Sequence, residues 1–173
     1  SGIDLSKIQL GKTVDLDNYE KDNPRDFTLL KRSTLSELKK GIFFETDWGN
    51  VRPSWHVECS AMATSLLGET MDIHTASRNL LFPHHENEIA IAESLTGKTL
   101  ANYWLHSELL MVDGKMMSSE NDNVITLQDV IDKGFTAREL RFLLFSVHYR
   151  KPIQFTYKRL ESVKTTLRRI DDF

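Results

Sequence analysis

The stretch Phe82-Pro-His-His-Glu-Asn-Glu-Ile-Ala90 combines a helix start with a dense group of metal-binding side chains. Pro83 suits the first position of a helix, where its missing N–H forfeits no hydrogen bond. The sequence therefore predicts a helix over residues 83–95. His84 and Glu88 are four residues apart in it, so their side chains should lie on one face, one turn apart.

Strand and helix patterns alternate around this stretch. An apolar helix pattern over 54–67 begins at Ser54, a good N-cap, and ends before Gly68. The patterns also predict strands over 27–31, 71–74 and 103–112, and loops over 41–53 and 113–123. Residues 33–40 are expected as a helix or a charged loop. Three further helices are expected to begin at Thr126, Thr136 and Thr156. Strands thus alternate with helices through residue 112 and helices alone follow, which predicts part of an α/β domain joined to a helical region.

Composition narrows the class of protein. The chain has 173 residues, of which 40% are hydrophobic and 27% are charged, as expected of a globular protein of about one domain. No apolar run approaches the roughly 18 residues that span a bilayer, so we expect no membrane segment. The single cysteine, Cys59, excludes an internal disulfide framework and favours a reducing compartment, the cytoplasm. Because the chain begins Ser-Gly-Ile without an initiator methionine, we expect a piece of a longer protein.

Charge is distributed unevenly along the chain. Residues 133–173 contain ten Lys or Arg and four Asp or Glu, whereas the whole chain has a net charge of −3. A basic end of this kind can indicate contact with nucleic acid, and it is also typical of a solvated amphipathic helix. The pattern alone leaves both interpretations open.

Three side chains suggest a metal site. An imidazole and a carboxylate placed like those of His84 and Glu88 can share one zinc ion, and Cys59 in the preceding helix offers a thiolate. Zinc would then need a fourth ligand from substrate, water or a residue outside this chain. The alternative is an ordinary helical pair beside a small buried cysteine.

Two further groups of residues could contribute to a site. Imidazoles recur in segments that should converge at one sheet edge, which favours a polar pocket there; they are His56, His74, His84, His85 and His106. The loop Lys115-Met-Met-Ser-Ser119 offers one cation and two hydroxyls that could contact phosphate.

Two stretches together resemble one enzyme family. Residues 53–62, Pro-Ser-Trp-His-Val-Glu-Cys-Ser-Ala-Met, are similar to the segment around a zinc-binding cysteine of cysteinyl-tRNA synthetases, and 82–90 is similar to that family's most distinctive signature. The separation between them fits without a gap. Further similarity lies in Asp72-Ile-His74, Asn102-Tyr-Trp-Leu-His106, Met111-Val-Asp113 and His148-Tyr-Arg150.

The resemblance implies a fold and a site. It implies that 22–123 is the C-terminal half of a Rossmann-type class I catalytic domain, after an irregular lead-in at 1–21 and before a helical stem-contact region at 124–173. It implies zinc as the selector of the cysteine thiolate, held by Cys59, His84 and Glu88, with the family's fourth ligand an N-terminal cysteine that this chain lacks. It also implies that the amino-acid pocket includes Trp55, His56, His74 and His106.

The resemblance further implies a two-step reaction. Cysteine and ATP, with magnesium, give cysteinyl-adenylate, and the cysteinyl group then passes to cysteine-specific tRNA, which the basic helices would contact. The family's Lys-Met-Ser-Lys-Ser signature falls on Met116-Met-Ser-Ser-Glu120, so Lys115, Ser118 and Ser119 are the candidate catalytic residues of an altered loop. At Thr75–Asn79 side chains replace the glycines with which the family approaches adenosine.

These departures leave three interpretations open. The first is the central piece of a cysteine–tRNA ligase, inactive without the N-terminal half that carries the His-Ile-Gly-His signature. The second is a synthetase-like paralogue that senses cysteine or ligates it to another acceptor. The third is a non-catalytic interaction module with a vestigial pocket.

Overall fold

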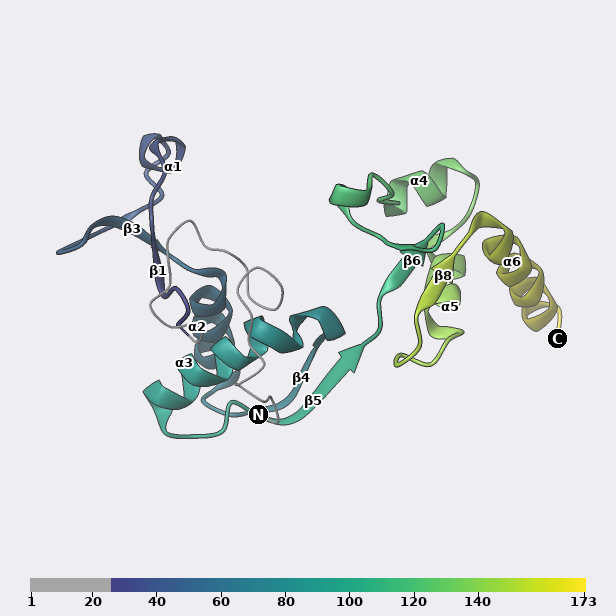
Figure 1. Cartoon of the computed structure of the whole chain (residues 1–173). Helices are drawn as coiled ribbons and strands as arrows, with labels where there is room; N and C mark the ends of the chain where they lie inside the picture. The colour runs from purple at the N-terminus through teal and green to yellow at the C-terminus, as the bar shows by residue number, and fades with distance from the viewer. Residues whose placement is uncertain (1–25) are drawn as a thin grey trace. The chain divides into compact units, whose positions relative to one another are not determined.

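The computed structural model describes residues 26–173, which mix helices with short strands and so confirm the predicted α/β class (Figure 1). They form two compact units. Among the described residues, the first comprises 26–74 together with Asn79–Leu105, and the second comprises Thr75–Arg78 and His106–Phe173. The domain ranges predicted from the sequence divide the chain elsewhere and stay predictions; the lead-in at 1–21 lies outside the described residues.

A small antiparallel sheet begins the first unit. Its strand order is β1-β3-β2, with β1 at Leu30–Arg32, β2 at Phe44–Thr46 and β3 at Gly49–Pro53, and the helix α1 at Leu35–Lys39 lies between β1 and β2 in the chain. The prediction of a loop over 41–53 is therefore wrong. Thr46 pairs with Gly49 at the closed end of the β2–β3 hairpin, and Gly49 has a φ of +96° that other residues rarely adopt.

Two packed helices follow in the first unit. The predicted helix at 54–67 is confirmed as α2, Trp55–Leu67, with Ser54 at its N-cap. It packs against α3, Glu86–Thr96, which ends at Gly97 in the left-handed conformation. This helix begins later than predicted, because a π-helical turn at Leu81–His85 precedes it.

The strands β4, Met71–Ser77, and β5, Ala101–Ser107, pair with each other next to these helices in the chain. A small apolar core forms where buried side chains of these elements meet; its members are Met71, Ala92, Leu100 and Ala101. The single strand predicted over 103–112 is in fact divided between β5 and β6, Leu110–Val112. Residues on α2, α3 and β4 are thus held beside one another.

The second unit contains the C-terminal helices and a three-stranded sheet. Its strand order is β7-β6-β8, with β7 at Lys115–Met116 and β8 at Ile153–Phe155, and β8 runs parallel to β6. The helices are α4 at Leu127–Asp132, α5 at Ala137–Phe145 and α6 at Tyr157–Asp171, each directly after the threonine at which the sequence predicts its start. The strands β7 and β8 correct the expectation that only helices follow residue 112, and β7 lies within the segment predicted as a loop over 113–123. One core unites the unit, with Val112, Val130, Leu143, Phe155 and Leu160 among its members.

No helix within 26–173 is long and apolar enough to cross a membrane.

The helix α5 begins with a complete capping box. The Thr136 hydroxyl accepts a hydrogen bond from Glu139 N, and the Glu139 carboxylate accepts one from Thr136 N at 2.7 Å. We expect Thr136→Ala to lower the free energy of unfolding of the second unit by about 1 kcal/mol, because a helix N–H loses its acceptor. Urea denaturation followed by circular dichroism measures this change. Thr165→Ala, on the exposed face of α6, is the control and should change the free energy by less than about 0.5 kcal/mol.

Candidate metal centre

The three predicted zinc ligands meet in the first unit. Cys59 lies in α2, His84 in the turn before α3 and Glu88 in the first turns of α3, and one potential ligand atom from each lies within 4.8 Å of the others. Cys59 is half-buried, whereas His84 and Glu88 are buried. The sequence separation between Cys59 and the other two is thus bridged by the packing of α2 against α3.

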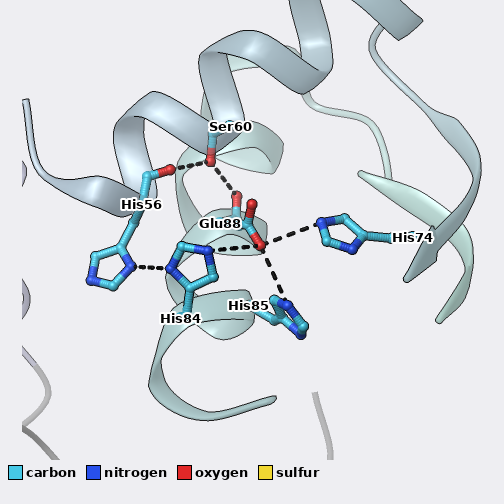
Figure 2. Close-up of polar contacts among 6 residues, drawn as sticks. All are labelled: His56, Ser60, His74, His84, His85 and Glu88. Atoms are coloured by element: carbon cyan, nitrogen blue, oxygen red, sulfur yellow. Dashed lines mark hydrogen bonds and ion pairs between the residues drawn. The ribbon is translucent and has the colours of Figure 1, made fainter. Parts of the chain in front are cut away.

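Glu88 is at the centre of the group. Its Oε2 is buried without a hydrogen-bond partner, while the Nε2 atoms of His74, His84 and His85 lie 3.4, 3.7 and 3.9 Å from it (Figure 2). Burial raises the pKa of the carboxyl group to about 7. A buried carboxylate without a hydrogen bond is costly, so this atom is suited to accept a cation.

His84 presents one nitrogen to this carboxylate. Its Nδ1 lies 2.7 Å from His56 Nδ1, and its ring stacks at a tilt on Trp55 with a centroid distance of 4.2 Å. Burial, and then the charges of His56 and His74, lower the pKa of His84 to about 4, so its imidazole is neutral at physiological pH. When Nδ1–H donates to His56, the Nε2 lone pair is directed to the Glu88 side and is available to a metal ion.

The Cys59 thiol remains protonated unless a cation is present. Burial and the carboxylates of Glu88 and Glu58 raise its pKa above the ordinary value. A thiol, a neutral imidazole and a buried carboxylate, with ligand atoms this close, fit the nitrogen, sulfur and oxygen preferences of zinc. Zinc would favour the thiolate and neutralise the carboxylate together.

The structure adds two residues that the sequence analysis did not assign to the site, Trp104 and Ser60, and it gives His85 a defined position. His85, expected only as one of several converging imidazoles, is buried with its Nε2 facing Glu88, and Trp104 on β5 stacks on His74 with a centroid distance of 4.3 Å. Ser60 Oγ lies 2.8 Å from His56 O and contacts the Glu88 backbone carbonyl, which joins α2 to α3 (Figure 2). The three-residue spacing of His85 and Glu88 was the available signal, since it also places both on one helix face.

Other predicted site residues lie in the second unit. His106 is on β5, and Lys115 is exposed on β7. Ser118 caps a short 3₁₀ turn, Ser119–Asn121, by accepting a hydrogen bond from Asn121 N, so its hydroxyl has a structural partner. Their roles in binding and catalysis stay predictions.

Asparagine side chains close the loop that follows β7. Asn123 Oδ1 accepts a hydrogen bond from Ser118 N at 2.9 Å, and Asn123 Nδ2 donates to Met116 O at 3.1 Å. Asn121 Nδ2 also donates to Met116 O. The loop is therefore held by its own side chains, with Ser119 exposed on it.

Residues 1–165 match the tRNA synthetases class I (C) catalytic domain. The chain belongs to this family. The match confirms the resemblance carried by the 53–62 and 82–90 stretches, and it confirms the predicted fold class of a class I synthetase catalytic domain. The match covers both units of the structure, apart from the end of α6.

Relatives of this class I synthetase domain share one name. Cysteine–tRNA ligase of Methanosarcina acetivorans is 45% identical over 172 residues, which are 99% of this chain and 36% of the relative. The proteins of the same name from Chlamydia pneumoniae and Protochlamydia amoebophila are 45% and 47% identical, over 100% of this chain and 36% of each relative. The chain thus spans 36% of the length of these relatives.

Proposed function

We propose that the chain is the part of a cysteine–tRNA ligase that binds zinc and selects cysteine. The observation that supports this most is the buried convergence of Cys59, His84 and Glu88, whose ligand atoms lie within 4.8 Å of one another. The name of the relatives supports the same activity for the longer protein. Cysteine, ATP with magnesium, and cysteine-specific tRNA are the proposed substrates, and the cytoplasm is the proposed location.

Zinc would supply a Lewis-acidic centre that binds the thiolate of cysteine far better than the hydroxyl of serine, so selection needs no editing step. His84 and Glu88 would orient the ion, and His56 would fix the tautomer of His84 through its 2.7 Å contact. Trp55, His56, His74 and His106 are the proposed lining of the amino-acid pocket. In the complete enzyme the cysteine carboxylate attacks the α-phosphorus of ATP and releases pyrophosphate, and a ribose hydroxyl at the tRNA 3′ end then displaces AMP.

Metal content tests the zinc site. We expect Cys59→Ala to contain about one equivalent of zinc less than the wild type by elemental analysis, because the variant loses the anionic sulfur ligand. Added cysteine should tighten zinc retention against a chelator, since its thiolate supplies a further ligand. Equal zinc content in wild type and Cys59→Ala would contradict the proposal.

The altered signature loop favours a second candidate, a protein that binds cysteine without activating it by ATP. Ser119 lies where the family's signature has a lysine, so the loop presents one cation fewer to the developing phosphate charge. Lys115, Ser118 and Ser119 are nevertheless the proposed catalytic residues of this loop. Cysteine-dependent exchange between ATP and pyrophosphate by the intact gene product supports the ligase, and its absence supports the second candidate.

The basic end of the chain is the proposed contact to tRNA. Arg168 and Arg169 are exposed in the last turn of α6. We expect the double variant Arg168→Glu/Arg169→Glu of the full-length protein to weaken tRNA binding. Each lost phosphate contact should also reduce, by about 0.7–0.9, the steepness with which the logarithm of the tRNA association constant falls with the logarithm of the salt concentration. Filter binding across salt concentrations measures both. The pair Lys39→Glu/Lys40→Glu changes the net charge equally on the first unit and is the control; equal effects of the two pairs would reject a specific contact.

A further inference from the structure

A second group of metal-binding side chains shares Glu88. Single ligand atoms of His74, His85 and Glu88 also lie within 4.8 Å of one another. We propose that His74, His85 and Glu88 bind a second divalent transition-metal ion, with Glu88 as the ligand common to this site and the zinc site. The proposal depends on the proposed function only through that shared carboxylate.

The distances suit coordination of one ion. Two ligands at 2.0–2.2 Å from a tetrahedral ion are about 3.3–3.6 Å apart. The Nε2 atoms of His74 and His85 lie 3.4 and 3.9 Å from Glu88 Oε2. A shift of a few tenths of an ångström in the His85 ring would therefore complete the geometry.

Burial supports a built site rather than a chance surface cluster. The side chains of His85 and Glu88 are both 3% exposed, and that of His74 is 16% exposed. Glu88 Oε2 has no hydrogen-bond partner and is directed into the group (Figure 2). An ion at this position would compensate the buried carboxylate oxygen, which has no hydrogen-bond partner.

Trp104 forms a wall of the second group. Its ring stacks on His74 with an interplanar angle of 18° and lies 5.1 Å from the His85 ring centroid. This packing fixes the orientation of both imidazoles, as the contacts of Trp55 and His56 do for His84. The two tryptophans therefore flank different metal groups.

The donor set determines the class of ion. Two imidazoles and one carboxylate, without a thiolate, suit Zn²⁺, Ni²⁺, Co²⁺ or Fe²⁺ and leave positions open for water or substrate. The first group has the thiolate and should retain zinc more tightly. Because Glu88 Oε2 faces the imidazoles of both groups, the two ions would share this carboxylate, so the affinities of the two sites are coupled through this residue.

Cobalt is the probe that separates the two sites. Co²⁺ bound by Cys59 gives a sulfur-to-cobalt charge-transfer band, whereas an imidazole and carboxylate site gives none. Co²⁺ at the second site should quench Trp104, and comparison with Trp104→Phe isolates that quenching from the quenching of Trp55. The titration uses the metal-free chain, with bound cobalt counted by equilibrium dialysis.

We expect two equivalents of Co²⁺ in the wild type. Cys59→Ala should retain one equivalent without the charge-transfer band, and His74→Gln should retain one equivalent with the band. Glu88→Gln should weaken both by at least about tenfold, as expected for loss of a metal ligand. His148→Gln, which removes an exposed imidazole of the second unit, is the control and should still bind two.

Other outcomes separate the proposals. One equivalent in the wild type, or a second equivalent that both His74→Gln and His85→Gln retain, overturns the second site. If the wild type binds a second equivalent of Co²⁺ that His74→Gln loses, but shows no charge-transfer band, the second site is supported and the proposed zinc site is contradicted. Circular dichroism of each variant confirms that the helices α2 and α3 remain folded.

Discussion

Zinc affinity of the chain is expected to fall about a thousandfold when the pH is lowered from 8 to 6. Zinc competes with protons at its ligands. The Cys59 thiol, whose pKa burial and nearby carboxylates raise, must lose a proton throughout this range, which costs about tenfold in affinity per pH unit. Below pH 7 Glu88 must lose a second proton, because burial raises its pKa to about 7.

His84 adds nothing to this dependence. Its pKa is lowered to about 4, so the imidazole is already neutral between pH 6 and pH 8. The slope of log affinity against pH should therefore steepen from about one to about two below pH 7. Competition with a chromogenic zinc chelator over this range measures the slope.

Glu88→Gln provides the control for this slope. The amide cannot take up the second proton, so the variant should bind zinc more weakly at pH 8 and retain a slope of about one down to pH 6. A wild-type slope of one over the whole range would show that Glu88 carries no proton to displace, and would contradict its role as a buried ligand.

Local signals in the sequence predicted the helices well. The caps of α4, α5 and α6 each consist of a threonine whose hydroxyl accepts a hydrogen bond from the third residue of the helix, and the sequence placed the start of each helix at that threonine. The β2–β3 hairpin was missed because it depends on pairing with β1, a contact made outside the segment itself. Such pairing overrides the weak strand propensity of Gly49–Pro53.

The candidate site shows the same division. The spacing of His84 and Glu88 predicted a shared face, but only the resemblance to a family connected Cys59 with them, because the packing of α2 on α3 leaves no local signal. His85 is buried just after a break in helical geometry at Phe82, which has a φ of −137° and a ψ of 134°. The sequence analysis named Trp104 only within a stretch that is similar to the family. Its stacking on His74 is a tertiary contact, which has no local signal in the sequence.

Leu160→Ala is expected to lower the free energy of unfolding of the second unit by about 3 kcal/mol. Leu160 on α6 has 0% exposure and belongs to the core that joins the helices to β6 and β8. Truncation removes apolar burial and leaves a cavity that the flanking β8 and α5 can fill only partly. Hydrogen exchange of residues 137–171 during a urea series measures the change for this unit.

The matched control is Ile170→Ala on the same helix. Ile170 is 54% exposed, so its truncation removes little buried surface and should cost less than about 1 kcal/mol. All three tryptophans, Trp48, Trp55 and Trp104, lie in the first unit, so tryptophan fluorescence reports the other transition. Because the two units have separate cores, we expect Leu160→Ala to leave that transition and zinc binding unchanged. A parallel loss of the tryptophan transition would instead mean that the metal centre depends on the C-terminal helices for its folding.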